Sequence, residues 1–272
     1  MRPFFEKHVL QQQPFKPMII VVDTTKAGSA SNTFVLPIIK DTTETVKIYW
    51  GDGTNSTGVN GNNTHVYAAS GIYTVKIESK LFGGVYFNAA LDALKIMKIS
   101  SYGDGLIRLS DTVFFGCENL TIASNVSSAK ILATSYTFMF GNCLNSTSAP
   151  FLNLAKAKNV SQMYRNNIAL VYVPLYDLSN TANVSGMFYG CAALKNIPLL
   201  NLSNVTNATN MFFGVTLTTQ SYSDFLINLA TLPLQSGVSF HGGNSKYNPT
   251  AAIARAYLIS TFGWTITDGG AA

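Results

Sequence analysis

Methionines recur every 24 residues in the second half of the chain. Met139, Met163, Met187 and Met211 hold this spacing three times in succession. A period of 24 fits neither a helix nor a strand, so it indicates a supersecondary unit that is copied along the chain. One copy cannot bury its own apolar face, whereas stacked copies align their apolar side chains into continuous interior rows. The sequence therefore predicts a solenoid.

Three further columns share this period and its frame. They hold proline, leucine and asparagine, respectively at Pro150, Pro174 and Pro198, at Leu154, Leu178 and Leu202, and at Asn159, Asn183 and Asn207. We expect the methionine and leucine columns to be buried. Strands stacked at about 4.8 Å per coil are expected near Val171–Tyr176 and Asn196–Leu200.

The three cysteines, Cys117, Cys143 and Cys191, occupy one position of the repeat. A buried free cysteine behaves as a small apolar residue, and neither a Cys-x-x-Cys pair nor a catalytic Cys-His arrangement is present. We expect buried free thiols, with a disulfide between Cys117 and Cys143 of adjacent coils as the alternative.

The fullest copy reads Met-Phe-Tyr-Gly-Cys-Ala-Ala-Leu from Met187 to Leu194 and continues through Ile197 and Pro198 to Leu202. It resembles the BspA-type leucine-rich repeat of bacterial surface proteins, with its Phe-x-x-Cys-x-x-Leu core and following Ile-Pro strand. The resemblance covers residues 95–217 and implies a leucine-rich-repeat solenoid. It names no ligand, because that family is defined by its scaffold.

Residues 18–80 carry the signals of a small β-sandwich. Short β-branched and aromatic runs, separated by clusters of Gly, Asn, Asp and Ser, favour this architecture. The expected strands are Met18–Val22, Thr33–Leu36, Thr45–Trp50 and Ile72–Ile77. An aromatic residue before Gly-Asp-Gly, then His-x-Tyr, then Gly-x-Tyr-x-Val follow one another from Trp50 to Val75. This order resembles the PKD (polycystic kidney disease) domain, which implies an Ig-like sandwich.

Asp52 lies between two glycines of this segment. We expect it to close a turn by bonding to its own backbone, since a calcium site would need several more oxygen ligands. Asp104 has the same setting, and His65 is interpreted as a strand-packing residue. No metal site and no cofactor is therefore expected.

Residues 218–272 are expected to close the stack as an α/β cap. Helices are predicted over Ser221–Ala230 and Thr250–Thr261, and strands over Val238–Phe240 and Trp264–Thr267. The second helix, the following Gly-Trp and strand, and the Asp-Gly-Gly ending resemble the C-terminal cap of leucine-rich-repeat proteins of phage tails and related adhesins. The fold class is thus mainly β, with a sandwich over 18–80, a solenoid and its N-terminal cap over 81–217, and this C-terminal cap.

Residues 1–17 are predicted to form an extended assembly arm. Its prolines, Pro3, Pro14 and Pro17, lack the N–H group that a central strand needs. The candidate partner-binding residues of the arm are Phe4, Phe5 and Phe15. The alternative is an edge strand of the sandwich.

The formal charge of +5 does not form a basic stripe, since residues 1–17 carry +2, residues 18–80 carry zero and residues 81–272 carry +3. Nucleic-acid binding requires clustered basic residues and is not expected. Neither a membrane span nor the apolar stretch of a signal peptide is found, so neither membrane insertion nor export by that route is expected. Enzymatic activity is not expected either, because His8, His65 and His241 are scattered and no phosphate loop or nucleophile elbow appears.

The leading hypothesis is a non-enzymatic phage virion protein of the tail, fibre or capsid surface. It would assemble in the host cytoplasm, bind other virion proteins or itself as a homo-oligomer, and display adhesion-type domains toward a host-surface glycan or protein. The alternative is a BspA-like adhesin of the bacterial cell surface or a carbohydrate-binding module. For a binding platform the candidate surface-recognition residues are Tyr164, Tyr172 and Tyr176, with Tyr189 in the same group.

Overall fold

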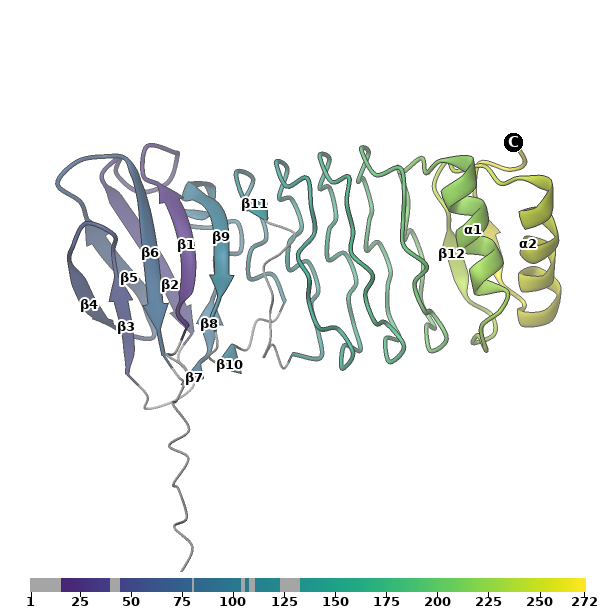
Figure 1. The fold of residues 1–272 in the computed structure, drawn as a ribbon, viewed down its shortest axis with the longest axis horizontal. Helices are drawn as coiled ribbons and strands as arrows, with labels where there is room; N and C mark the ends of the chain where they lie inside the picture. The colour runs from purple at the N-terminus through teal and green to yellow at the C-terminus, as the bar shows by residue number, and fades with distance from the viewer. Residues whose placement is uncertain (1–15, 40–44, 80, 104–105, 108–110, 123–132) are drawn as a thin grey trace, which may run out of the picture.

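The structure is a computed structural model that describes residues 16–39, 45–79, 81–103, 106–107, 111–122 and 133–272. Within these residues the fold is mainly β, with thirteen strands, one 3-10 helix and two α-helices. Sheets occupy one end, stacked coils of chain the middle and both α-helices the other end (Figure 1). Phe4, Phe5 and Phe15 of the predicted arm, and Asp104, lie outside the described residues.

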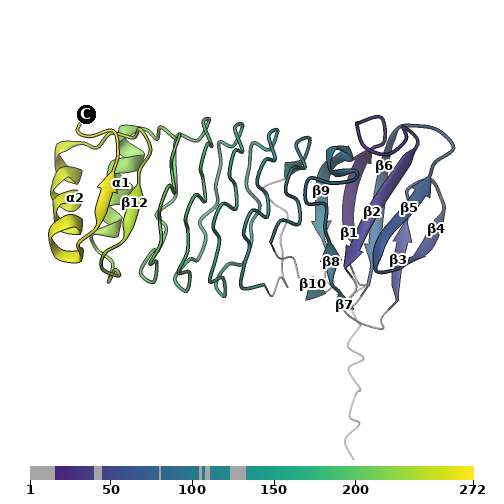
Figure 2. The ribbon, with the colours of Figure 1, turned by 180° about the vertical axis from the view of Figure 1, so that it is seen from behind.

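Two sheets lie face to face at the N-terminal end, the larger nearer the viewer in Figure 1 and the smaller in Figure 2. The larger sheet contains β1 (Met18–Asp23), β3 (Val46–Tyr49), β4 (Asn55–Gly58), β6 (Ile72–Glu78), β9 (Ile96–Tyr102) and β11 (Thr121–Ile122), in the order β11-β9-β1-β6-β3-β4. The smaller sheet contains β2 (Thr33–Ile39), β5 (Gly61–Val66) and β8 (Gly84–Val85), in the order β5-β2-β8. A parallel pair is formed by β7 (Leu81–Phe82) and β10 (Leu106–Ile107). Alternate side chains of β1 are buried between the sheets, as the sequence pattern predicts.

The larger sheet continues past residue 80 into the stacked coils. β9 pairs antiparallel with β1 and parallel with β11. β9 begins at Ile96, directly after the 3-10 helix η1 (Ala93–Lys95). β9 is therefore both a strand of the N-terminal sheet and the first rung of the stack.

The coil stack begins at β9, and over residues 133–217 it has a backbone period of 24 residues. Parallel bridges connect Ser135, Asn159, Asn183 and Asn207 in succession. The N–H group of Val160 donates to the carbonyl of Asn183 at 2.9 Å, and equivalent bonds join the other coils. Each coil thus satisfies backbone groups of its neighbour, as buried polar groups require.

The predicted interior columns are confirmed. The four methionines of the repeat are fully buried, and the leucine column is at most 1% exposed. Beside the methionines, aromatic rings of successive coils stack with centroids 5.5–5.9 Å apart, namely Phe114, Phe140, Tyr164, Phe188 and Phe212. These rows form a continuous core with the N-terminal sheets.

All three cysteines are buried free thiols. Burial raises the pKa of Cys117, Cys143 and Cys191, so the thiol form is favoured. The predicted interior position is confirmed, and the alternative disulfide is not formed.

The strands predicted over Val171–Tyr176 and Asn196–Leu200 are wrong. In these two segments the only bridge is the one between Tyr172 and Ser148. The proline column follows two residues after this bridge, and proline has no N–H group to continue a ladder.

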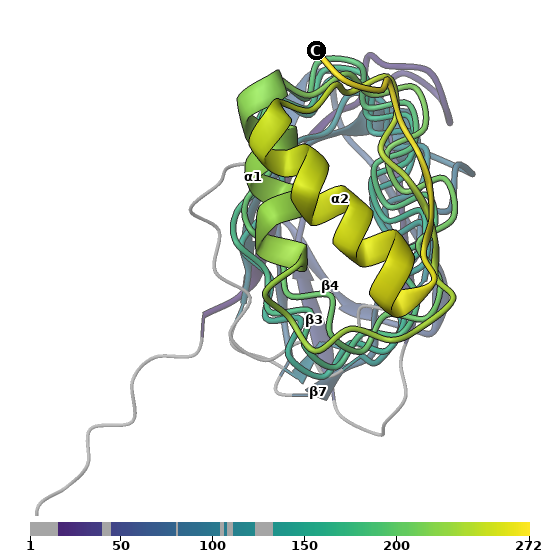
Figure 3. The same ribbon diagram turned by 90° about the vertical axis from the view of Figure 1, so that its right-hand side faces the viewer.

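The cap closes the far end of the stack, where α2 (Pro249–Phe262) lies across the coils beside α1 (Thr219–Leu229) (Figure 3). The side chains of Thr218 and Asn248 accept backbone N–H bonds as N-caps of the two helices. The strands β12 (Ser239–His241) and β13 (Thr265–Thr267) pair in parallel. Both predicted helices and both predicted strands are confirmed to within two residues.

Candidate functional site

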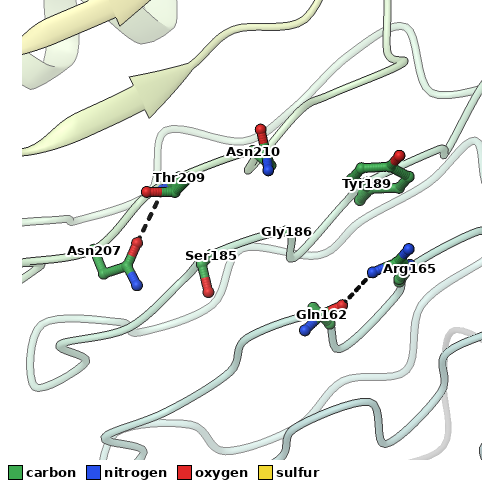
Figure 4. Close-up of a pocket in the computed structure, with 8 residues that line it drawn as sticks. All are labelled: Gln162, Arg165, Ser185, Gly186, Tyr189, Asn207, Thr209 and Asn210. Atoms are coloured by element: carbon green, nitrogen blue, oxygen red, sulfur yellow. Dashed lines mark hydrogen bonds between the residues drawn. The ribbon is translucent and has the colours of Figure 1, made fainter.

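One side of the coil stack carries a hollow of about 360 Å³, which we call the polar hollow (Figure 4). Three successive coils contribute its lining, which is Gln162, Arg165, Ser185, Gly186, Tyr189, Asn207, Thr209 and Asn210. Gly186 shares its repeat position with Gln162 and Asn210, so the missing side chain leaves space between theirs. Gly186 has φ of +59°, and a Cβ there would lie 3.1 Å from Cγ of Gln162. Any larger residue would therefore be strained and would fill the hollow.

The asparagine column orients the polar groups at this surface. Oδ1 of Asn207 accepts a hydrogen bond from the N–H group of Thr209 at 3.1 Å. Asn159 and Asn183 likewise accept from the N–H group of the residue two positions later, Ser161 and Ser185. This local bond is the usual way in which asparagine stabilises a turn. It leaves Nδ2 of Asn207 directed toward the side of Ser185 (Figure 4).

A row of side chains begins at the polar hollow and continues along the stack to strand β12 of the cap. We call Arg165, Tyr189, Phe213 and His241 the Arg165 row. The guanidinium carbon of Arg165 lies 4.5 Å from the ring centroid of Tyr189. The rings of Tyr189 and Phe213 stack with centroids 4.8 Å apart, and the rings of Phe213 and His241 meet edge to face with centroids 5.3 Å apart. Since both faces of the Tyr189 ring are covered, the ring presents its edge and its hydroxyl group to solvent.

Arg165 is the one charged residue that lines the polar hollow. One of its terminal nitrogens donates to Oε1 of Gln162 at 2.5 Å. Among the described residues no carboxylate forms an ion pair with Arg165. The hollow therefore carries an uncompensated positive charge surrounded by neutral amide and hydroxyl groups.

The surface role predicted for Tyr164 and Tyr176 is wrong. Both side chains are at most 2% exposed, and their hydroxyl oxygens lie 2.6 Å apart. The hydroxyl of Tyr176 also donates to the carbonyl of Pro150 at 2.7 Å. Burial raises the pKa of both phenols, which fixes them as neutral core groups.

Tyr172 is exposed, but it lies on the Ser148 side of the coil rather than at the polar hollow. Tyr189, considered in the same group, does line the hollow. The sequence analysis did not predict Arg165 and Gln162 as site residues. The available signal was that Arg165, Tyr189 and Phe213 share one repeat position.

A second cluster surrounds Asp52 in the N-terminal sheets. Oδ1 of Asp52 accepts the N–H and hydroxyl groups of Thr54 at 2.9 and 2.6 Å, which confirms the predicted turn. Oδ2 lies 2.8 Å from Nε2 of His65, and this imidazole stacks on Trp50 at 4.8 Å. Burial alone would raise the pKa of Asp52, but the bonds from Thr54 and His65 outweigh it and lower the pKa to about 2. The cluster thus organises the turn.

The substitution Asp52→Asn tests this role through its pH dependence. Because the folded-state pKa lies below the ordinary value, the carboxylate stabilises the fold above about pH 4, and this contribution is lost as pH falls toward about pH 2. At neutral pH the substitution should lower the free energy of unfolding by on the order of 0.5–1 kcal/mol, since the side chain is partly solvated. Urea unfolding of both proteins across this pH range measures the difference. A difference that stays constant with pH would contradict the assignment.

Comparisons with protein-family models, with curated proteins and with solved structures give no significant match. In the described part of the chain, no three His, Cys, Asp or Glu side chains are grouped to hold a metal ion. No helix of the described residues is long and apolar enough to span a membrane. Any functional assignment therefore depends on the geometry and chemistry of the surface.

Proposed function

We propose that the chain is a non-enzymatic attachment protein that binds a cell-surface glycan or protein through the polar hollow. The observation that supports this most directly is the hollow itself, a concave surface built from side chains that recur with the coil period. Its amide and hydroxyl groups both donate and accept hydrogen bonds, which suits recognition rather than proton transfer. No carboxylate, thiol or imidazole is among the residues that line it, so a general base or an activated nucleophile is not supplied.

The scaffold proposed for this role is a PKD-type, Ig-like sandwich joined to a short BspA-type leucine-rich-repeat solenoid. The order of motifs from Trp50 to Val75 supports the first part. The 24-residue bridges and the buried methionine column support the second. A stack of this kind holds binding side chains on a rigid surface, which lowers the entropic cost of binding.

The proposed setting is a phage virion, with the arm bound to other virion proteins or to a second copy through Phe4, Phe5 and Phe15. Charged residues make up only 11% of the chain, a composition common among virion and extracellular β-proteins. A bacterial surface adhesin or a carbohydrate-binding module would use the same hollow and is the alternative. The virion setting and this alternative differ in what the arm binds, whereas the role of the hollow is the same in both.

The substitution Tyr189→Ala tests the attachment role. Tyr189 supports Arg165 on one ring face and Phe213 on the other, so its loss should disorder the border of the hollow. Binding to a panel of immobilised cell-surface polysaccharides and to whole bacterial cells should fall by about tenfold or more, as for an aromatic residue at the centre of an interface. Surface plasmon resonance and cell pull-down measure the change.

Tyr172→Ala is the matched control, because it removes an exposed tyrosine from another side of the coil. It should leave binding unchanged, and both variants should keep the thermal transition of a folded protein. The proposal fails if the wild-type chain binds neither the panel nor the cells. It also fails if the two tyrosine substitutions reduce binding equally.

A further inference from the structure

We infer that the ligand of the polar hollow is an acidic polysaccharide, whose carboxylate or sulfate groups bind Arg165. This inference rests on the proposed function and names the chemical class of ligand for the same surface. Three features of the hollow support it: a guanidinium without a carboxylate partner among the described residues, the outward edge of an aromatic ring, and the neutral polar lining.

The guanidinium of Arg165 is held in place but is not neutralised. Gln162 accepts one of its N–H groups, and the ring of Tyr189 supports its plane. No acidic side chain is among the lining residues. A planar guanidinium offers paired N–H groups that match the two oxygens of a carboxylate or sulfate. An oriented guanidinium without a carboxylate partner in the hollow is suited to an oxyanion from another molecule.

The aromatic rings of the Arg165 row add to this preference. Tyr189 has its two faces covered by Arg165 and Phe213, so its edge is the part of the ring that faces outward. The edge of an aromatic ring is the positive part of its quadrupole. The arrangement disfavours stacking of a sugar ring on Tyr189 and favours an anionic group beside Arg165.

The remaining lining suits a polyhydroxylated polymer better than an acidic peptide. Ser185, Thr209 and Asn210 offer both donors and acceptors, and Nδ2 of Asn207 adds a donor. Tyr189 is the one lining residue with a large apolar side chain, so the hollow has no pocket for the apolar anchors on which peptide binding usually depends. The coils are spaced by about 4.8 Å, so a linear polymer can contact equivalent groups on several of them.

The test uses the full chain and a panel of immobilised polysaccharides in matched pairs. Polymers that contain hexuronic acids or sialic acid are paired with their carboxyl-reduced forms, and sulfated polymers with their desulfated forms. The wild-type protein is expected to bind at least one acidic polymer about tenfold or more tightly than its neutral partner, as for the loss of a charge-assisted hydrogen bond. The carboxyl and sulfate pairs distinguish the two sources of the oxyanion.

The substitution Arg165→Gln should abolish this preference while leaving the thermal transition unchanged. Lys195→Gln is the matched control, because it removes an exposed positive charge at a residue that does not line the hollow. Added salt should weaken binding of the wild-type and Lys195→Gln proteins in parallel.

The inference is overturned if neutral polymers bind as tightly as acidic ones, or if the preference survives in Arg165→Gln. Equal binding of polyglutamate would also overturn it, since charge alone would then determine affinity. If neutral polymers bind and Tyr189→Ala abolishes that binding, the attachment role stands without the acidic ligand. If nothing on the panel or on cells binds, the proposed function fails as well.

Discussion

Replacing Lys95 by methionine is expected to lower the free energy of unfolding by about 3–5 kcal/mol. Lys95 and Asp92 are fully buried, with Nζ of Lys95 3.6 Å from Oδ1 of Asp92. The ammonium group also donates to the carbonyls of Ser29, Ala30 and Thr33 at 2.7–3.0 Å. Methionine has a similar length, so packing is largely kept. The loss comes from a buried carboxylate and buried carbonyls that are left without their cationic partner.

Asp92 carries the other half of this network. Its carboxylate accepts the N–H and hydroxyl groups of Ser29 at 2.6 and 2.8 Å and the N–H group of Val35 at 2.7 Å. The network therefore ties β2 and the segment before it to η1 and to the residue that precedes η1, at the point where the N-terminal sheets meet the coil stack. Its disruption should destabilise both parts, because one continuous core joins them.

Lys98→Met is the matched control, since Lys98 is an exposed residue of β9. Its effect should stay within about 0.5 kcal/mol, as is usual for surface substitutions. Urea unfolding followed by far-ultraviolet circular dichroism measures both variants. Similar losses for Lys95→Met and Lys98→Met would show that the buried pair contributes little to stability.

The repeat could be predicted because equivalent positions of every coil have the same environment and therefore require the same kind of side chain. Met187 must be buried for the reason that Met163 must be buried, so the columns report burial without knowledge of the coil's shape. The helices of the cap were equally accessible, since caps and apolar patterns are local signals. The strands expected near Tyr172 do not form, because the proline column removes the N–H groups that a ladder requires.

The Asp92 to Lys95 network could not be predicted from local patterns. Its partners lie about sixty residues earlier in the chain, as the bond from Ser29 to Asp92 shows, and no periodicity connects them. A lysine and an aspartate three residues apart are usually a solvated surface pair. Only the fold places both in the core and forces residues 93–95 out of strand conformation.

The candidate site was predicted in part. Tyr164 and Tyr189 lie one and two residues after a repeat methionine, yet the first is buried and the second borders the polar hollow. The coil has no regular helix or strand period here, so its sequence does not predict whether each side chain faces the core or the solvent. The repeat does state that Arg165 and Tyr189 face the same side, because residues 24 apart are equivalent.

Replacing Met187 by alanine is expected to lower the free energy of unfolding by about 2–5 kcal/mol. The side chain is fully buried, and its coil lies between the coils that carry Met163 and Met211. The N–H group of Tyr164 donates to the carbonyl of Met187 at 2.9 Å, so the backbone cannot easily move to fill the space. Truncation should therefore leave a cavity, whose cost adds to the lost burial of the side chain.

Two further variants identify the source of that loss. Met187→Leu nearly preserves side-chain volume and should cost less than about 1.5 kcal/mol, which separates the cavity from any specific need for methionine. Met97→Ala removes a half-buried methionine of β9 outside the column and should cost clearly less than Met187→Ala. In a stack each coil contacts only its neighbours, so Met163→Ala should lower the free energy of unfolding by an amount similar to Met187→Ala. Because the two coils are adjacent, the loss in the double variant should differ from the sum of the two single losses. A loss in Met187→Ala no larger than in Met97→Ala would mean that the methionine column does not hold the coils together.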